Sequence, residues 1–367
     1  MKGRWLSLLA TATVAGFVAG CGSAPRPAAP RSSAVTVSPT AEPTHRAPSV
    51  APQPTPTSGK AGAAPCVSGT CWVAVNVATA WVQPWYPRPV DEPSLASPAD
   101  PVAWLQDMTL AQRQWLTGRL ETQAVYGVQV IVTGHWGSWT HVAIPSQPTN
   151  RDPRGYPGWI PTAQLTSTAP ATASVYALTR ENTWLWSGWT DAGVSAHQVM
   201  LASYDTILPV VRVTGGYVVV ALIGGQDAAV SRADVTLHAA GESWGATRAG
   251  IVAEASKFLG LPYLWGGTSG FGFDCSGFTY SVYRAFGITI SRDADQQAVY
   301  GTPVDLSALA PGDLVFFRDS STGPVGHVGL YAGNGNMIDA PHTGAEIRIE
   351  PVSSFPYYAG ARRYLTS

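Results

Sequence analysis

The sequence predicts a multidomain protein in which two small all-β units precede one α+β domain. Three observations support this fold class. Residues 22–65 have a composition that cannot form a hydrophobic core, and residues 72–238 consist mostly of short strand patterns separated by glycine and proline turns. Residues 241–367 combine two amphipathic helix patterns with three strand patterns. A length of 367 residues is enough for two or three domains.

The charge balance of the chain is close to neutral. The formal net charge is −1 and only 12% of the residues are charged. The sequence therefore lacks the basic character that nucleic-acid binding requires, and we expect no nucleic-acid partner. The 14 tryptophans and 14 tyrosines are typical of well-packed small β domains or of sugar-facing surfaces, and we assign them to core packing.

The first 21 residues have the pattern of an export signal. Lys2 and Arg4 precede an apolar run over residues 6–18, which is too short to span a bilayer. Small residues before Cys21 match a lipoprotein processing site, which predicts cleavage before this cysteine and lipidation of its thiol. An ordinary secretory signal with an incidental cysteine is the alternative. We therefore expect a cell-envelope protein that is anchored to the membrane outside the cytoplasm.

Residues 22–65 are dominated by Pro, Ala, Ser and Thr. This composition favours an extended, disordered tether between the anchor and the folded part. Cys66 and Cys71 follow the tether. In an exported protein two nearby cysteines predict a disulfide, and a zinc site would need a second ligand pair. Cys275 is then the cysteine left over.

The two β units are expected over residues 66–167 and 168–238. The first contains a helical insertion over residues 101–120, where apolar residues recur at helical spacing. In the second unit, residues 210–223 form a hairpin pattern with a Gly-Gly turn.

The third domain, residues 239–367, carries the residues with the clearest chemistry. An amphipathic helix pattern covers residues 247–259, and a second one begins at Cys275 after a glycine-rich turn. A cysteine in the first turn of a helix experiences unpaired N–H groups and the positive end of the helix dipole, which both favour the thiolate. A small buried hydrophobic residue is the commoner role of a cysteine outside a disulfide. The helix position favours a nucleophile.

His327 opens a strand pattern over residues 327–331. A nucleophilic cysteine, a distant histidine and a third polar residue that orients the imidazole make up the thiol-hydrolase arrangement. On its own, His327 would be read as a structural residue. A thiolate–imidazole mechanism needs no metal, and the glycine-rich turn lacks the Gly-Lys-Ser/Thr of a phosphate loop. We therefore expect neither a metal nor a cofactor.

Four motifs of the third domain occur in the order found in the NlpC-type cell-wall cysteine peptidases, which this domain resembles. They are Pro-Tyr-Leu-Trp-Gly-Gly from Pro262, Asp-Cys-Ser-Gly-Phe from Asp274, Pro-Gly-Asp-Leu-Val-Phe-Phe from Pro311 and Gly-His-Val-Gly-Leu-Tyr from Gly326. The resemblance implies a papain-like α+β fold in which Cys275 is the nucleophile and His327 the base.

The arrangement of two small all-β units before such a domain resembles the γ-D-glutamyl-diamino-acid endopeptidases, which carry two bacterial SH3-like domains. Residues 88–91, 121–124 and 155–161 match the first of these domains. The resemblance implies hydrolysis of the γ-D-Glu to diamino-acid bond in peptidoglycan stem peptides or muropeptides, by a monomer. A wall-binding scaffold with an inert thiol, and an amidase or acyltransferase on the same fold, are the alternative functions.

Asp339 and His342 are the two candidates for the third catalytic residue. Family members usually have a histidine where Asp339 stands. If residues 334–335 form a two-residue turn, His327 pairs with His342 and Asp339 points to the other face of the hairpin. If residues 333–335 form a three-residue loop that ends in a left-handed glycine, the register shifts by one and Asp339 joins the face of His327. We predict the three-residue loop, with Asp339 orienting the imidazole.

The resemblance also implies how the substrate is held. Tyr263 is expected to donate to the developing oxyanion beside the Cys275 N–H. Asp293 matches the carboxylate that holds the free amine of an N-terminal L-Ala, and Glu121 and Tyr156 match residues that close the same end. An ammonium in a partly desolvated pocket requires such anionic partners. The alternative roles are a helix cap for Asp293 and a surface position for Glu121.

One further departure from the family, one residue outside the catalytic set and three substrate contacts complete the expected site. The family's serine beside the amine-binding carboxylate is Ala294 in this sequence. His342 is expected on the surface or at the rim of the groove. The remaining substrate contacts are assigned to Asp274, Ser276 and Trp265.

Overall fold

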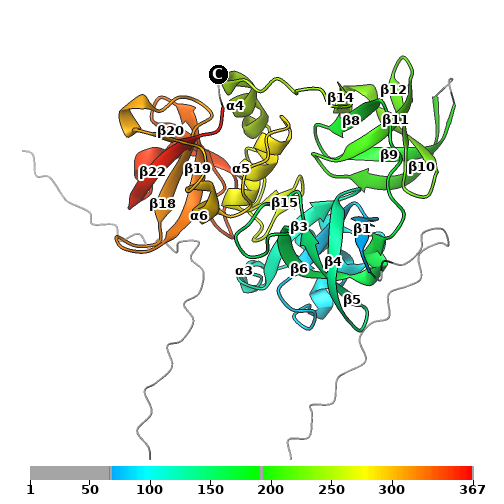
Figure 1. The fold of residues 1–367 in the computed structure, drawn as a ribbon, viewed down its shortest axis with the longest axis horizontal. Coiled ribbons are helices and arrows are strands. Elements are labelled where there is room, and N and C mark those ends of the chain that lie inside the picture. Colours follow the sequence, from blue (N-terminus) through cyan, green and yellow to red (C-terminus); the bar gives the residue numbers. More distant parts are fainter. Residues whose placement is uncertain (1–65, 67, 191–192, 366–367) are drawn as a thin grey trace, which may run out of the picture.

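The computed structural model describes residues 66, 68–190 and 193–365. Three folded units follow one another along the chain, and each of them contacts the other two (Figure 1). The predicted export signal, the lipidation site at Cys21 and the tether over residues 22–65 lie outside the described residues. Among the described residues, no helix has both the length and the apolar character needed to cross a membrane.

The first unit is a seven-stranded antiparallel sheet with the strand order β3-β2-β6-β5-β4-β1-β7. Its strands are β1 (Thr70–Val73), β2 (Val77–Trp81), β3 (Leu120–Val125), β4 (Gln129–Trp136), β5 (Trp139–Ile144), β6 (Tyr156–Pro161) and β7 (Leu165–Thr166). A disulfide joins Cys66 to Cys71, with the two sulfur atoms 1.96 Å apart. Both half-cystines are buried in the core of this unit.

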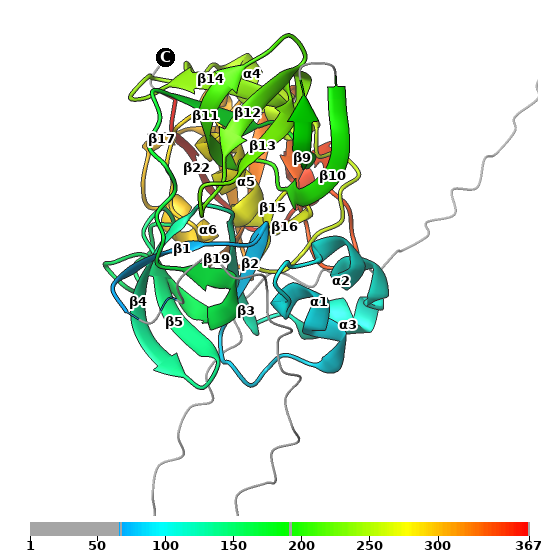
Figure 2. The same ribbon diagram turned by 90° about the vertical axis from the view of Figure 1, so that its right-hand side faces the viewer.

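A helical insertion separates β2 from β3, but the prediction of one helix over residues 101–120 is wrong. The insertion consists of α1 (Glu92–Leu95), α2 (Pro101–Asp107) and α3 (Leu110–Trp115), which lie on one side of the unit (Figure 2). The break falls at Thr109. Its hydroxyl accepts the Gln112 N–H at 3.3 Å while the Gln112 side chain accepts the Thr109 N–H at 2.8 Å, so a new helix starts here. The end of the predicted helix, at Leu120, is already strand β3.

The second unit is also a seven-stranded antiparallel sheet, with the order β10-β9-β13-β12-β11-β8-β14. Its strands are β8 (Val175–Thr179), β9 (Thr183–Thr190), β10 (Gly193–Ala202), β11 (Ile207–Val213), β12 (Tyr217–Ala221), β13 (Asp227–Ser231) and β14 (Val235–Ala239). The predicted hairpin over residues 210–223 is present: the Thr214 N–H donates to the Tyr217 carbonyl at 2.9 Å across Gly215 and Gly216.

The third unit combines three helices with a six-stranded antiparallel sheet of order β17-β22-β18-β19-β20-β21. The helices are α4 (Arg248–Ser256), α5 (Cys275–Arg284) and α6 (Ala294–Gln297), and a small hairpin is formed by β15 (Thr268–Ser269) and β16 (Gly272–Phe273). The sheet strands are β17 (Thr302–Val304), β18 (Leu314–Arg318), β19 (Val325–Gly333), β20 (Asn336–Asp339), β21 (Arg348–Pro351) and β22 (Tyr358–Arg363).

Helix α5 packs against this sheet through its apolar side. Phe278 and Val282 share one buried core with Phe316, Val328 and Ile338 from the sheet. The three predicted strands correspond to β18, β19 and β20, and the structure extends the sheet on both sides. Helix α5 lies against β19 (Figure 1), and Cys275, its first residue, interacts with His327 of β19.

A buried ion pair docks the second unit onto helix α5. The Arg284 guanidinium contacts the Asp205 carboxylate and donates to the Asp205 carbonyl at 2.9 Å. Burial raises the pKa of Asp205 to about 6, although the Arg284 charge opposes the shift. Asn182 adds a second link, because its amide donates to the Gly270 carbonyl at 2.8 Å.

The substitution Arg284→Met should lower the stability of the protein by about 3–5 kcal/mol near neutral pH, since it leaves the Asp205 carboxylate buried without its cation. The expected readout is a lower thermal unfolding midpoint. The matched control is Arg154→Met, which removes an exposed guanidinium and should leave the midpoint unchanged.

The loss caused by Arg284→Met should shrink as the pH falls from about 7.5 to about 5. Burial raises the pKa of Asp205 above its unfolded value, and Arg284 opposes this rise. Without Arg284 the pKa of Asp205 is higher still, so as the pH falls the folded variant gains more stability from protonation than wild type does. The difference between wild type and variant at each pH isolates this effect from other carboxyl groups. A loss that grows on acidification would contradict the assignment.

Candidate active site

The helix start that carries Cys275 is fixed by Asp274. One carboxylate oxygen of Asp274 accepts the Gly277 N–H at 2.6 Å, which caps helix α5, and the other accepts the Gly266 N–H at 2.9 Å. A Cβ atom at Gly277 would lie 2.0 Å from the Gly267 carbonyl oxygen, so the close approach of loop and helix requires glycine. Cys275 is the first residue of α5 and is 5% exposed.

Behind the nucleophile lies Arg292, which the sequence analysis missed. Its side chain is 1% exposed and donates to both oxygens of Asp274, at 3.0 and 2.6 Å. It also donates to the Ser276 hydroxyl at 3.0 Å and to the Thr122 hydroxyl of the first β unit at 2.9 Å. The polar atoms of Asp274 and Ser276, which we expected to contact substrate, are therefore engaged inside the protein. No spacing rule pointed to Arg292, because its partners come together only in the fold.

His327 and Asp339 are buried together on neighbouring strands. His327 Nε2 lies 2.8 Å from Asp339 Oδ1, and the two residues are 5% and 0% exposed. The Asp339 carboxylate is fully buried and interacts with the imidazole of His327 on one side and with the Glu350 carboxyl group on β21 on the other. The Phe355 ring stacks on His327 with ring centroids 4.6 Å apart and an angle of 12° between the planes. The ring is therefore held both at its edge and on its face.

The environment of His327 favours the imidazolium. Burial by itself lowers the pKa of His327, but the interactions with the Asp339 carboxylate and with Cys275 together outweigh burial. The net result is a pKa well above the usual histidine range. Since Nε2 faces Asp339, Nδ1 is the nitrogen that remains for the sulfur. An imidazolium beside the sulfur stabilises a thiolate, which is the nucleophilic form of cysteine.

The hairpin between β19 and β20 reaches the predicted register by a different local structure. Asn334 and Gly335 form a two-residue turn with φ values of 53° and 77°, closed by the pair Gly333–Asn336, so the predicted three-residue loop is wrong. A bulge between Tyr331 and Gly333 then shifts the register by one residue. The shift puts Asp339 on the face of His327, as the sequence analysis expected.

His342 does not take part in this cluster. Its side chain is exposed, and its Nδ1 lies 3.1 Å from the Thr343 carbonyl oxygen. The structure therefore brings Asp339, rather than His342, to the imidazole. A third carboxyl group, that of Glu350 on β21, lies near Asp339; burial raises its pKa, the Arg348 guanidinium opposes this, and Asp339 raises it further.

Three residues expected at the amine end of the substrate also lie together. The Tyr156 hydroxyl donates to Asp293 Oδ1 at 2.9 Å across the boundary between the first and third units. Arg151, which the sequence analysis did not include, donates to Glu121 at 2.7 Å and to the Tyr156 hydroxyl at 3.2 Å. Asp293 stands at the start of α6 but makes no side-chain capping bond. Burial raises its pKa, although the Arg292 charge opposes the shift.

Trp265 lies at the same boundary, whereas Tyr263 lies in the buried core around Cys275. Tyr263 is 2% exposed and belongs to the buried core that contains Cys275. Its backbone N–H donates to the Ala345 carbonyl at 2.9 Å. The Trp265 indole N–H donates to the Leu120 carbonyl of the first unit at 3.1 Å, so this group holds two domains together.

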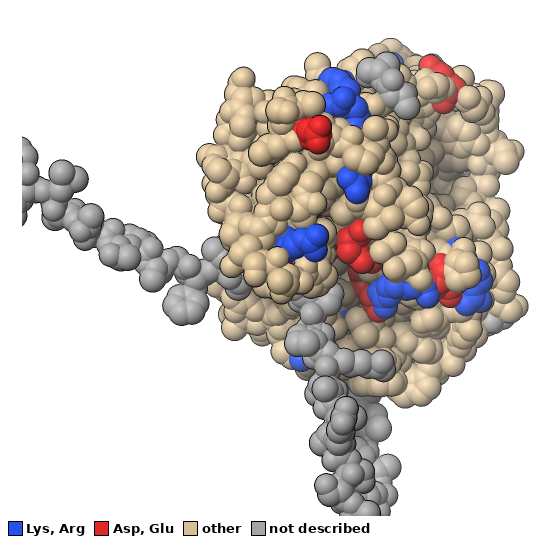
Figure 3. Space-filling model, turned by 60° about the vertical axis from the view of Figure 1, so that its left-hand side comes forward, with Lys and Arg blue, Asp and Glu red and all other residues tan. Residues whose placement is uncertain are grey.

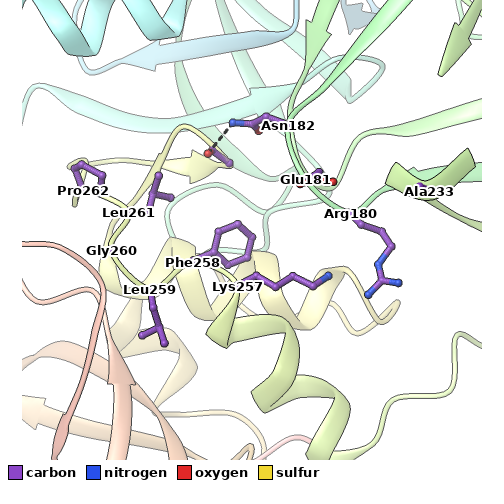
Figure 4. Close-up of a pocket in the computed structure, with 11 residues that line it drawn as sticks. Arg180, Glu181, Asn182, Ala233, Lys257, Phe258, Leu259, Gly260, Leu261 and Pro262 are labelled. Carbon is purple, nitrogen blue, oxygen red and sulfur yellow. Dashed lines mark hydrogen bonds between the residues drawn. The ribbon is translucent and has the colours of Figure 1, made fainter. Parts of the chain in front are cut away.

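A separate hollow of about 600 Å³ lies between the second and third units (Figure 4). Figure 4 shows Arg180 and Lys257 on its wall and the hydrogen bond from Asn182 to the Gly270 carbonyl. Cys275, His327 and Asp339 are not among its lining residues. We therefore place the candidate active site at Cys275 and not in this hollow. On the face shown in Figure 3, charged side chains are few, and basic and acidic ones lie beside each other.

The comparison with known proteins agrees with the geometry. The sequence pattern of the NlpC/P60 family matches residues 260–363. A γ-D-glutamyl-L-lysine dipeptidyl-peptidase of Bacillus cereus is 40% identical over 305 residues, which are 80% of this chain and 90% of the relative. The chain belongs to the NlpC/P60 family. The corresponding enzyme of Bacillus subtilis is 39% identical over 74% of this chain and 90% of its own length.

A solved structure supports the same assignment for the whole fold. The crystal structure of an NlpC/P60 family protein from Bacillus cereus superposes with a TM-score of 0.75 and 38% identity, covering 81% of this chain and 99% of that one. The predicted family resemblance is thereby confirmed. An NlpC/P60 catalytic domain preceded by all-β sheets is confirmed as well.

The substitution Asp339→Ala should lower kcat by about 100-fold or more with little change in KM, because the carboxylate supports the imidazolium mainly in the transition state. His342→Ala is the matched control and should change kcat little, since its side chain is exposed. Steady-state kinetics on a stem-peptide substrate measure both values. A larger loss in the His342 variant would show that Asp339 is not the orienting residue.

Proposed function

We propose that the protein is a cysteine endopeptidase that hydrolyses the γ-D-Glu to diamino-acid bond of peptidoglycan stem peptides. The observation that carries the proposal is the buried contact between His327 and Asp339 beside Cys275 at the start of helix α5. The names of the two Bacillus relatives give the substrate class. A scaffold with an inert thiol would not need a buried, charge-supported imidazole at the sulfur.

The proposed reaction proceeds through a thioester. The Cys275 thiolate attacks the γ-carbonyl carbon of D-Glu, and the Cys275 N–H and the Tyr263 hydroxyl stabilise the oxyanion. The imidazolium of His327 gives its proton to the leaving amine as the C–N bond breaks. The neutral imidazole then takes a proton from water, the hydroxide attacks the thioester, and the thiolate leaves. Asp339 stabilises the imidazolium in both halves of the reaction.

The amine end of the groove supports a preference for stem peptides with a free N-terminal L-Ala. Glu121 and Asp293 place two carboxylates around the Tyr156 hydroxyl. An ammonium that leaves water needs such partners, whereas an N-acylated amine would leave them without a cation. A dipeptidyl-peptidase releases two residues from a chain end, which agrees with an amine site two residues before the scissile bond. Trp265 would border the same groove.

The domain assignments belong to the same proposal. We assign residues 66–167 and 168–238 to two bacterial SH3-like domains and residues 239–367 to the catalytic domain. The first β unit forms one wall of the groove, since it contributes Glu121 and Tyr156. The family acts on the cell wall, which places the protein outside the cytoplasm. A lipid anchor on Cys21, a tether over residues 22–65 and a monomeric state complete the proposal.

The deciding experiment compares three substrates: free L-Ala-γ-D-Glu-L-Lys, its N-acetylated form and an intact muropeptide. Rapid release of L-Ala-γ-D-Glu from the free peptide alone is expected, and mass spectrometry identifies the products. A second arm replaces L-Lys by meso-diaminopimelate to define the diamino acid. Equal rates on all three substrates would contradict the amine site, and cleavage at another bond would indicate an amidase.

The substitution Cys275→Ala should abolish hydrolysis without unfolding the protein, because alanine fits a buried helix start. In the wild-type protein, Cys275 should be alkylated by iodoacetamide at neutral pH, and prior alkylation should block turnover. Product formation by mass spectrometry and a thermal melt give the two readouts. Substantial turnover in a folded alanine variant would contradict the cysteine peptidase proposal.

A further inference from the structure

The amine end of the groove already contains a cation that belongs to the protein. The Arg151 guanidinium makes a two-pronged contact with the Glu121 carboxylate and donates to the Tyr156 hydroxyl at 3.2 Å. The same hydroxyl donates to Asp293 at 2.9 Å. Arg151 therefore lies among the three residues to which the proposed function assigns the substrate ammonium.

Of the two arginines at this end, Arg151 and Arg292, only the Arg151 side chain can move away from the amine site. Arg292 is 1% exposed and is held by Asp274, Ser276 and Thr122. The Arg151 side chain is 40% exposed, while that of Glu121 is only 10% exposed. Arg151 sits on the connection between β5 and β6, where its backbone N–H donates to the Thr149 hydroxyl. A solvent-accessible side chain on a loop can swing out at small cost, whereas Arg292 cannot.

We infer that Arg151 is a specificity-determining residue that occupies the ammonium site and is displaced by the substrate amine. The inference rests on the proposed function, because it uses the same site. When the amine enters, one cation replaces another beside Glu121, so the Glu121 carboxylate keeps a positive partner throughout. The exchange is close to balanced for a substrate with a free amine.

The exchange is unfavourable for a substrate without an amine. An N-acetylated or sugar-linked stem would have to remove Arg151 and leave the largely desolvated Glu121 carboxylate, which is 10% exposed, facing a neutral amide without a cation. If Arg151 stays, it blocks the end of the groove. Arg151 thus disfavours binding of stem peptides with an acylated amine, and it also weakens binding of those with a free amine.

The test variant is Arg151→Gln, and the matched control is Arg154→Gln. Arg154 lies in the same loop, is 51% exposed and pairs with Asp152, not with Glu121. Both substitutions remove one positive charge, so the comparison cancels any general change of the surface potential. On free L-Ala-γ-D-Glu-L-Lys, Arg151→Gln should lower KM by about 5-fold and change kcat less than KM. Arg154→Gln should leave both values unchanged.

Direct binding gives a second readout without turnover. Calorimetric titration of the free peptide into Cys275→Ala should give a weaker Kd than titration into Cys275→Ala with Arg151→Gln, by the same factor of about 5. Thermal melts establish that each variant is folded. If the glutamine variant does not fold, Arg151→Lys replaces it. Lysine keeps the charge but cannot make a bidentate contact with Glu121. The KM of the Arg151→Lys variant should therefore lie between that of wild type and that of Arg151→Gln.

Two results would overturn the inference. A higher KM in Arg151→Gln would mean that Arg151 builds the site, and a KM equal to that of Arg154→Gln would mean that it does not enter the site. The wild-type protein separates these outcomes from a failure of the proposed function. If wild type does not cut the free peptide at all, the peptidase proposal fails; if wild type cuts it and only the Arg151 effect is missing, the competition fails.

Discussion

The carboxylate of Asp274 is the interaction on which the rest of the site depends. It caps helix α5, holds the loop at Gly266 and binds Arg292, which also reaches Thr122 in the first β unit. One buried group therefore fixes the nucleophile's helix, the turn before it and the neighbouring domain. Removing the partners of a buried carboxylate costs several kcal/mol, so these contacts oppose any independent movement of the helix, the turn and the first unit.

The local sequence was sufficient to predict much of this arrangement. Helix patterns placed α4 and α5 close to their observed starts, and strand patterns located β18, β19 and β20. The hairpin shows where such reasoning stops. The turn at Asn334 and Gly335 followed the common two-residue geometry, which alone would have turned Asp339 away from His327. A bulge restored the contact, and a bulge depends on packing that a strand pattern does not contain.

The residues that sequence reasoning missed share one property. Arg292, Arg151 and Phe355 each act through partners that are distant in the chain, as in the contact of Arg292 with Thr122 and that of Phe355 with His327. Charge and hydrophobicity patterns report what a segment does within its own helix or strand, so they cannot report these pairs. The broken helix at Thr109 was a different failure, since the Thr-x-x-Gln capping box was visible in the sequence.

The boundary between the first and third units has a consequence for how such enzymes can diversify. The proposed chemistry lies wholly in the third unit, at Cys275, His327 and Asp339. The proposed recognition of a chain end is split, with Glu121 and Tyr156 on one side of the boundary and Asp293 on the other. A gene that lost the first unit would keep its catalytic residues but lose the wall that checks for a terminus. Under the proposed function, the restriction to chain ends comes from an added domain, and loss of that domain would yield an endopeptidase of broader specificity.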